Sequence, residues 1–167
     1  MIALTSLTAG AKLKIVVRAG AGYDNIDLKA ASARGMDRIQ ADYLGMLATL
    51  FNAVAIRETL ALIQVPAVVL SALPIPALAE TYYPLPARKE LADGKVLLLA
   101  AGTGNPFFTT DTAAALRASE LGADLILKAT QVDGVYDDDP RINPQARLFR
   151  EMTYDQYLQG RLEVMDA

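Results

Sequence analysis

The chain has no cysteine and no histidine among its 167 residues. Without cysteine, disulfide bonds, thiolate metal sites and cysteine nucleophiles are all excluded. Without histidine, the commonest general base and imidazole-based zinc sites are excluded as well. Any chemistry must therefore use carboxylates, cations, hydroxyl groups and backbone donors. Phosphoryl transfer is a reaction class that such a set can catalyse, because positioning and charge stabilisation contribute most of the catalysis.

An excess of charge of one sign is also missing, since the formal net charge is -3. This balance gives no indication of a surface that binds nucleic acid. Hydrophobic residues make up 53% of the chain and the mean hydropathy is +0.24, which is typical of an α/β protein whose sheet is covered on both faces. At this length we expect a single domain over residues 1–167 that buries a sizeable core.

One charge-free interval, between Glu58 and Glu80, is long enough to cross a membrane. Three prolines fall within it, the first at Pro66, and they would break a spanning helix. A helix end, a buried strand at Ala67–Ser71 and a loop explain the interval better. The N-terminus shows no apolar signal-peptide core. We therefore expect a soluble, cytoplasmic protein that makes no contact with a membrane.

The most informative stretch reads Ala-Ala-Gly-Thr-Gly-Asn-Pro-Phe-Phe-Thr-Thr-Asp-Thr-Ala over residues 100–113. It follows an apolar run that predicts a buried strand, and it leads into a helix-forming run. Gly102 and Gly104 let the backbone approach a ligand closely. Thr109, Thr110 and Asp111 supply oxygens that can cap the helix. A strand, a glycine turn and a helix N-terminus together favour an anion, typically phosphate.

The rest of the chain alternates predicted strands and helices, which predicts a three-layer αβα sandwich with a mainly parallel sheet. The helix over 42–63 is apolar on more than one side, so it fits either a core helix or a subunit interface. Gly122 is placed as a helix C-cap. The expected strands are Leu13–Val17, Ala67–Ser71, Lys95–Ala100 and Ala123–Leu127, and the expected helices are Asp42–Ile63, Asp111–Leu121 and one that begins near Asp27.

The string over 100–113 resembles the uridine-monophosphate-binding signature of bacterial UMP kinases, members of the amino-acid-kinase superfamily. The resemblance extends through Gly35–Arg38, Ala41–Thr49, Leu127–Tyr136 and Leu162–Asp166, so it covers residues 35–167. It implies an amino-acid-kinase-like fold and a cytoplasmic enzyme of pyrimidine nucleotide biosynthesis. That enzyme would transfer a phosphoryl group from ATP, with Mg2+, to UMP, giving UDP. Family members are homohexamers, so the resemblance also implies a homo-oligomer.

The resemblance further assigns roles to single residues. Asp42 corresponds to the aspartate that holds the ribose hydroxyls of UMP, and Asp111 falls near the transferring phosphoryl group. Asp166, in a Val-Met-Asp segment, corresponds to a second acidic residue near the reaction centre. The residues implied to contact UMP are Gly22, Asp42, Thr103, Gly104, Asn105, Pro106, Phe107, Phe108, Thr109 and Thr110.

Several of these residues also have purely structural explanations. Asp42 and Asp111 can cap helices, and the two phenylalanines can be core residues. The acidic run Asp137–Asp139 is typical of a solvated turn, because a calcium loop would need alternating ligands and a distal glutamate. The resemblance instead implies that the adenosine of ATP is held by Thr130, Tyr136 and Asp139.

Residues 1–34 depart from the family pattern. UMP kinases open with a strand that ends in a Lys-Leu-Ser-Gly type turn, whose lysine neutralises the transferring phosphate, and no such turn occurs here. An ungapped alignment places Gly22 at a UMP-contacting glycine but puts Asp27 where an arginine is expected, which reverses the charge opposite phosphate. Residues 13–31 instead resemble a segment of D-2-hydroxyacid dehydrogenases related to phosphoglycerate dehydrogenase, although the dinucleotide fingerprint and a histidine are missing.

Three functions therefore stay open. The first is a UMP kinase, and the second is a hybrid or fragment that binds UMP with impaired catalysis because the phosphate-neutralising lysine is missing. The remote third is a 2-hydroxyacid dehydrogenase fragment. The resemblance also implies a sheet that is incomplete at both ends, whose open edges a second copy can cover.

Overall fold

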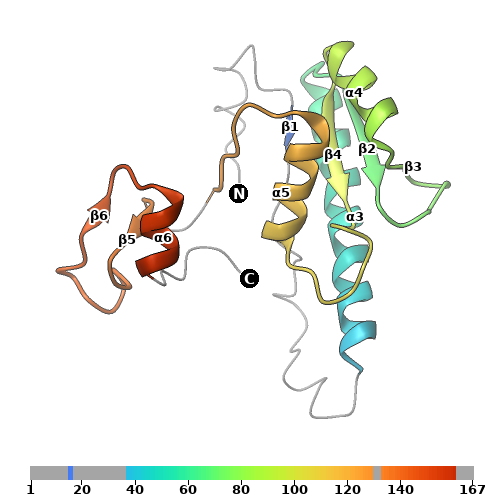
Figure 1. Cartoon of the computed structure of the whole chain (residues 1–167). Helices are drawn as coiled ribbons and strands as arrows, with labels where there is room; N and C mark the ends of the chain where they lie inside the picture. The colour runs from blue at the N-terminus through green and yellow to red at the C-terminus, as the bar shows by residue number, and fades with distance from the viewer. Residues whose placement is uncertain (1–14, 17–36, 130–132, 161–167) are drawn as a thin grey trace. The chain divides into compact units, whose positions relative to one another are not determined.

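The structure is a computed structural model that describes residues 15–16, 37–129 and 133–160. The chain divides into two compact units, Met1–Ile126 and Leu127–Ala167, which we call the sheet unit and the hairpin unit. Figure 1 shows the elements of each unit along the chain. The expectation of a single domain over residues 1–167 stays a prediction.

The sheet unit is built on four parallel strands in the order β1-β4-β2-β3 (Figure 1). β2 and β4 pair along their whole length, with Ala67 opposite Val96 and Ser71 opposite Ala100. β2 has the predicted bounds, and β4 begins one residue later than predicted. Of the strand predicted at 13–17, only residues 15–16 are described, and they form β1. The strand bounds are β1 Ile15–Val16, β2 Ala67–Ser71, β3 Glu80–Thr81 and β4 Val96–Ala100.

One long helix, α3 (Arg38–Leu62), covers one face of the two central strands. Its Leu50 and Leu60 are buried against Val69 of β2 and Leu98 of β4. Folding thus removes the hydrophobic side chains between α3 and the sheet from water. This burial is the main source of stability for such a layer.

The opposite face is covered by α4 (Pro84–Ala92) and α5 (Thr110–Leu121). Ala87 and Leu121 pack there against Leu97 of β4. Because successive side chains of a strand point to opposite faces, Leu97 and Leu98 join different layers. Helices on both faces of parallel strands confirm the α/β fold class and the predicted three layers.

The start of α3 differs from the predicted start at Asp42. The helix begins at Arg38, because Asp37 is its N-cap and accepts a hydrogen bond from the backbone N–H of Ile39 at 2.9 Å. The structural explanation of Asp42 as a helix cap is therefore wrong. Asp42 lies in the second turn of α3, where its carboxylate is available for contacts outside the helix.

Within this chain α3 is buried on the side that faces the sheet, so the choice between a core helix and a subunit interface stays open. Leu44, Leu47 and Phe51 form an apolar stripe on α3 that lies away from the sheet, and Phe51 is 77% exposed. Among the described residues, α3 is the helix that is long and apolar enough to cross a membrane. A core helix meets the same test of length and composition, and α3 packs on a sheet through its buried face.

The strand predicted at Ala123–Leu127 does not form, although Gly122 is the helix C-cap in the left-handed conformation, as predicted. Leu125, Ile126 and Leu127 are exposed. A short apolar run becomes a strand only where a neighbouring strand takes up its backbone N–H and C=O groups. No described strand pairs with these residues.

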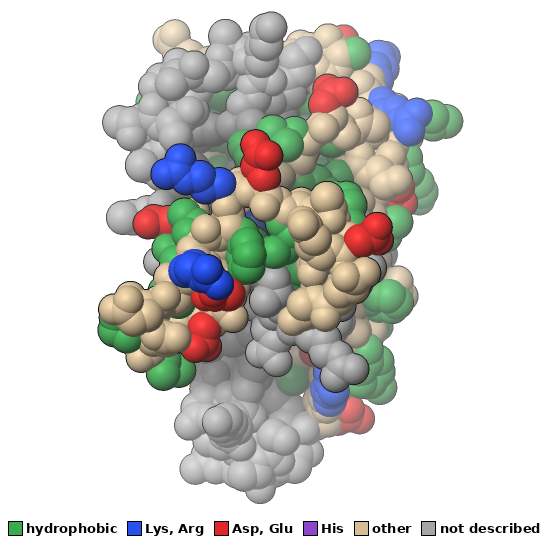
Figure 2. All heavy atoms as spheres, turned by 60° about the vertical axis from the view of Figure 1, so that its left-hand side comes forward, with side chains coloured by type: hydrophobic (Ala, Val, Ile, Leu, Met, Phe, Trp, Pro, Cys, Tyr) green, Lys and Arg blue, Asp and Glu red, His purple; other side chains and the backbone are tan. Residues whose placement is uncertain are grey.

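The hairpin unit holds a two-stranded antiparallel sheet and one short helix. β5 (Val135–Tyr136) pairs with β6 (Leu148–Phe149), and α6 spans Tyr154–Gly160. Figure 2 shows basic and acidic side chains next to one another on the surface of the molecule. The sequence predicted none of these strands, because two-residue strands leave too short a pattern to detect.

Candidate functional site

The loop after β4 has an unusual backbone. Within residues 101–108, which we call the glycine loop, Ala101, Gly102, Gly104 and Phe107 all have φ between 57° and 79°. This left-handed region costs glycine little, but it costs a residue with a Cβ about 1–2 kcal/mol. Ala101 and Phe107 therefore keep this conformation only because surrounding contacts hold the loop.

Gly104 brings the loop close to the end of β2. A Cβ atom on Gly104 would lie 3.1 Å from the backbone oxygen of Ala72 and 3.3 Å from its Cβ. The N–H of Gly104 donates to the carbonyl of Ala101 at 2.9 Å, which closes a tight turn. Thr103 Oγ1 accepts from the N–H of Asn105 at 3.1 Å in the same turn. Glycine at position 104 is thus required by its positive φ and by this close approach.

Asp42 joins the long helix to the glycine loop. Its Oδ2 accepts a hydrogen bond from the backbone N–H of Phe107 at 2.8 Å, across 65 positions of sequence. The pairing brings together two segments that the sequence singled out for the same ligand. Because an ionised carboxylate accepts up to about four hydrogen bonds, Asp42 keeps capacity to accept from a ligand as well.

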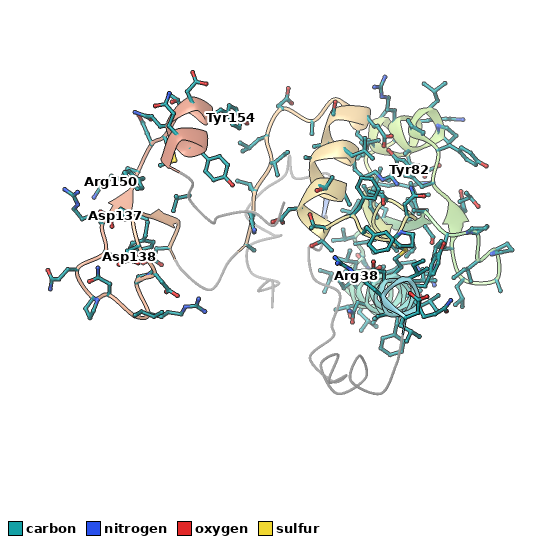
Figure 3. The ribbon with its side chains drawn as sticks, turned by 60° about the horizontal axis from the view of Figure 1, so that its bottom comes forward. Arg38, Tyr82, Asp137, Asp138, Arg150 and Tyr154 are labelled. Carbon is teal, nitrogen blue, oxygen red and sulfur yellow. The ribbon has the colours of Figure 1, made fainter. Side chains whose placement is uncertain are left out.

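The two phenylalanines of the loop are not core residues. Phe107 is 60% exposed and Phe108 is 59% exposed, which rules out their structural explanation. The guanidinium carbon of Arg38 lies 5.2 Å from the centre of the Phe107 ring, a cation–π distance. Figure 3 labels Arg38 at the start of α3. A cation and an aromatic face are thus presented beside Asp42.

Two further side chains hold the start of the glycine loop. Thr49 Oγ1 on α3 accepts from the N–H of Ala101 at 2.7 Å and donates to the carbonyl of Met46 at 2.7 Å. Arg117 Nη2 on α5 donates to the carbonyl of Gly102 at 3.0 Å. The loop is therefore fixed from the helix layers on both faces of the sheet.

Arg117 is buried and belongs to a charged cluster. It is 8% exposed, its Nη1 donates to Glu120 Oε2 at 2.8 Å, and its guanidinium carbon lies 4.1 Å from the centre of the Tyr82 ring. The Tyr82 hydroxyl also donates to Glu120 Oε2, at 2.9 Å. Figure 3 labels Tyr82 among the packed side chains of the sheet unit. The Glu120 carboxylate thus accepts hydrogen bonds from both buried groups, the Arg117 guanidinium and the Tyr82 hydroxyl.

The ionisation of this cluster follows from its environment. Burial, together with the hydrogen bond to the Glu120 carboxylate, raises the pKa of Tyr82 to about 12. Burial alone would raise the pKa of Glu120, but the hydrogen bonds from Arg117 and Tyr82 outweigh it and hold that pKa below its ordinary value. At neutral pH the cluster is therefore a carboxylate between a guanidinium and a neutral phenol.

The glycine loop leads directly into α5. Thr109 is the N-cap of that helix, and its Oγ1 accepts from the N–H of Thr112 at 3.1 Å. Asp111 therefore does not cap α5 but lies in its first turn, only 4% exposed. The first N–H groups of a helix and its dipole favour an anion at this end. The strand, glycine turn and helix N-terminus expected from the sequence are all present.

Two of the residues assigned to ATP lie in the hairpin unit. Tyr136 is half-buried in β5, and Asp139 follows it in the loop between β5 and β6. Arg141 donates to Asp139 from Nε at 3.1 Å and from Nη2 at 3.0 Å. These hydrogen bonds hold the pKa of Asp139 below its ordinary value. Asp137 and Asp138 lie in the same unit (Figure 3).

The remaining assigned residues, Gly22, Thr130 and Asp166, lie outside the described residues. Sequence reasoning missed Thr49 and Arg117. Thr49 follows Asp42 by two helical turns, so it lies on the same face of α3. Arg117 lies between buried Ala113 and Leu121 at intervals of four, and a charge on an apolar helical stripe predicts a paired, buried guanidinium.

Within the described ranges, no group of three or more acidic residues lies close enough together to hold a metal ion. The acidic run at 137–139 is instead engaged by hydrogen bonds with Arg141, Asn143 and Arg147. Its explanation as a solvated turn fits these contacts.

Known proteins resemble this chain over most of its length. A model of the amino acid kinase family matches residues 5–166. The chain is 52% identical over 139 residues to a uridylate kinase of Legionella pneumophila (strain Paris), covering 83% of the chain and 56% of that protein. It is 50% identical over 137 residues to a uridylate kinase of Ectopseudomonas mendocina (strain ymp), covering 82% and 56% respectively. The chain thus spans a little over half the length of these curated relatives.

Solved structures show the same likeness. A UMP kinase from Ureaplasma parvum matches with a TM-score of 0.78 at 40% identity, covering 83% of the chain and 60% of that structure. A UMP kinase from Bacillus anthracis matches with a TM-score of 0.79 at 34% identity, covering 83% and 57%. The family match runs across residues 13–31, so the resemblance of that segment to a dehydrogenase finds no support.

Proposed function

The chain belongs to the amino acid kinase family, and we propose that it is a UMP kinase, which transfers a phosphoryl group from ATP to UMP and gives UDP. The observation that carries the proposal is the hydrogen bond from Phe107 N–H to Asp42 Oδ2 at 2.8 Å. It joins the two segments that resemble the UMP-binding parts of this family. Similarity to uridylate kinases at about half identity supports the same substrate.

In this proposal the glycine loop and the start of α5 bind UMP. Asp42 accepts from the ribose hydroxyls, and the exposed rings of Phe107 and Phe108 lie against the base. The N-terminus of α5 stabilises the phosphate through its N–H groups and dipole. The residues proposed to contact UMP are Gly22, Asp42, Thr103, Gly104, Asn105, Pro106, Phe107, Phe108, Thr109 and Thr110.

The chemical step uses charge placement rather than proton transfer from histidine, which the chain lacks. Asp111, at the first turn of α5, and Asp166 are proposed to lie near the transferring phosphoryl group. Thr130, Tyr136 and Asp139 are proposed to hold the adenosine of ATP. Mg2+ would enter bound to the ATP phosphates, because phosphoryl transfer needs their charge neutralised.

The experiment is a pair of measurements on the purified chain. Calorimetric titration with UMP, CMP and AMP tests binding, and a coupled assay of ADP release tests turnover with UMP and MgATP. Preferential binding of UMP together with ADP release supports the proposal. Binding of UMP without turnover contradicts the kinase and favours the impaired UMP-binding alternative. Equal affinity for the three nucleotides contradicts the assignment of the site.

Assembly into a homo-oligomer, a hexamer by family resemblance, and a cytoplasmic location also stay proposals. The apolar stripe of Leu44, Leu47 and Phe51 on α3 supports self-association, because exposed apolar patches commonly mark protein interfaces. Sedimentation of the chain at micromolar concentration decides it. A dimer or larger species is expected, and a clean monomer would contradict the proposal.

A further inference from the structure

The dipeptide Ala101–Gly102 is held at both of its ends by side chains. Thr49 Oγ1 accepts from the N–H of Ala101 at 2.7 Å, and Arg117 Nη2 donates to the carbonyl of Gly102 at 3.0 Å. Thr49 lies on α3 and Arg117 on α5, which cover opposite faces of the sheet. The point where the chain leaves β4 is therefore fixed from both layers.

This dipeptide decides the direction of the whole glycine loop. Ala101 has φ 63° and Gly102 has φ 57°, so two successive left-handed residues turn the chain sharply at the end of β4. For Ala101 this conformation is unfavourable without outside support. Any relaxation there would rotate the backbone of every following loop residue, including the N–H of Phe107 that contacts Asp42.

Neither side chain is placed to touch a ligand itself. Arg117 is 8% exposed, and its guanidinium is committed to Glu120, to the Tyr82 ring and to the Gly102 carbonyl. Thr49 is half-buried and uses its hydroxyl both as donor and as acceptor. Their common effect is on the loop backbone.

We infer that Thr49 and Arg117 are positioning residues for the nucleotide site. They hold Ala101 and Gly102 in the left-handed conformation before the ligand arrives. The loop therefore loses little conformational entropy when the ligand binds. The inference rests on the proposed function for the identity of the ligand, UMP. The state of the loop in the free protein can be measured without any ligand.

The test on α3 compares three variants of the whole chain. Thr49→Val removes the acceptor of the Ala101 N–H but keeps the shape of the side chain, and Thr49→Ser restores the hydroxyl. Thr59→Val is the matched control, because Thr59 Oγ1 is exposed on the same helix and donates only to the Ala55 carbonyl. Thermal unfolding confirms first that each variant is folded.

The test on α5 uses Arg117→Lys, which keeps the charge but cannot reproduce the planar, multidentate contacts of the guanidinium. The matched control is Arg88→Lys. Arg88 donates to the backbone carbonyl of Glu120 from Nε at 2.9 Å and from Nη2 at 2.6 Å, and it is exposed.

Two measurements are made on every variant. Amide hydrogen exchange of Ala101 and Gly104 in the free protein reports the loop, and calorimetry reports the affinity for UMP and, separately, for ATP. Thr49→Val and Arg117→Lys should each speed loop exchange and weaken UMP binding about fivefold to tenfold, with ATP affinity unchanged. Thr49→Ser and both controls should behave as the wild type.

Unchanged exchange at Ala101 in Thr49→Val overturns the inference, as does faster exchange with unchanged UMP affinity. Equal loss of ATP affinity also overturns it, because a general structural defect would have that effect. If the wild-type chain binds no UMP, the proposed function fails. The exchange rates of the ligand-free variants then still decide whether Thr49 and Arg117 hold the glycine loop in its conformation.

Discussion

The glycine loop and the acidic loop of residues 137–147 are held in opposite ways. The glycine loop is fixed by side chains that lie far away in the sequence, with Asp42 65 positions from Phe107 and Thr49 52 positions from Ala101. The acidic loop is fixed locally, since Asp137 contacts Arg147 ten positions away and Asp139 contacts Arg141 two positions away. The Thr49 contact is partly buried, whereas the Asp42 contact and both contacts of the acidic loop are exposed.

The difference indicates how each loop can serve a ligand. Long-range contacts from two helix layers fix a backbone that would otherwise relax, so the glycine loop is preorganised by the whole sheet unit. Local, exposed ion pairs add little stability and are weakened by salt. The acidic loop therefore depends on its own turn chemistry, and its carboxylates exchange partners at lower cost.

The largest expected effect separates the two units by stability. Leu97 in β4 is fully buried, whereas Leu127 at the start of the hairpin unit is 73% exposed. Leu97→Ala should lower the free energy of unfolding by about 2–5 kcal/mol. Leu127→Ala should change it by less than about 0.5 kcal/mol. Chemical denaturation of both variants checks this, and equal losses would remove the contrast between the units.

The next effect concerns the buried cluster behind the glycine loop. Because the pKa of Tyr82 is raised to about 12 in the folded chain, folding favours the neutral phenol. That stability is present in full below the ordinary phenol pKa of about 10, and up to about 2–3 kcal/mol is lost as the pH rises to about 12.

Ultraviolet titration of the tyrosines and denaturation at several pH values measure this effect. Tyr82→Phe should remove the phenol that titrates at about pH 12. The free energy of unfolding of this variant should then fall less as the pH rises. Tyr83→Phe is the control, because Tyr83 is exposed beside it. A Tyr82 that titrates together with the exposed tyrosines would show that the cluster is open to water.

The third effect separates ligand binding from helix capping on α3. Asp42→Ala should weaken UMP binding by about 1–3 kcal/mol, because in the proposed site the ribose hydroxyls and the Phe107 N–H both lose an acceptor. Asp37→Ala removes the N-cap and should cost about 0.5–2 kcal/mol of stability with little change in UMP affinity. Calorimetry and denaturation distinguish the two. A similar loss of UMP affinity in both variants would mean that Asp42 acts only through the helix.

Sequence patterns predicted the local parts of this molecule. The buried strand over 67–71 and the helix C-cap at Gly122 depend on nearby residues, and both are observed. The structure also brings Asp42 into contact with the glycine loop, and the family resemblance assigned both to the UMP site. These features follow from apolar runs, glycine and motif order, which a sequence displays directly.

Other features of the fold were not predicted correctly. The apolar run at 123–127 has no paired neighbour among the described strands and stays irregular. The contact of Arg117 with Gly102 depends on how α5 packs beside β4, which no local pattern encodes. The predicted start of α3 was wrong for a local reason, because Asp37 caps the helix, which therefore begins at Arg38.

The most direct test maps nucleotide binding onto backbone amides by nuclear magnetic resonance. UMP added to the labelled chain should shift the amides of residues 102–112 most, with Phe107 among the largest changes because its N–H is bound to Asp42. Amides of the hairpin, residues 135–149, should respond to ATP instead. Unchanged amides over 102–112 at saturating UMP would contradict the assignment of the glycine loop as the uridylate site.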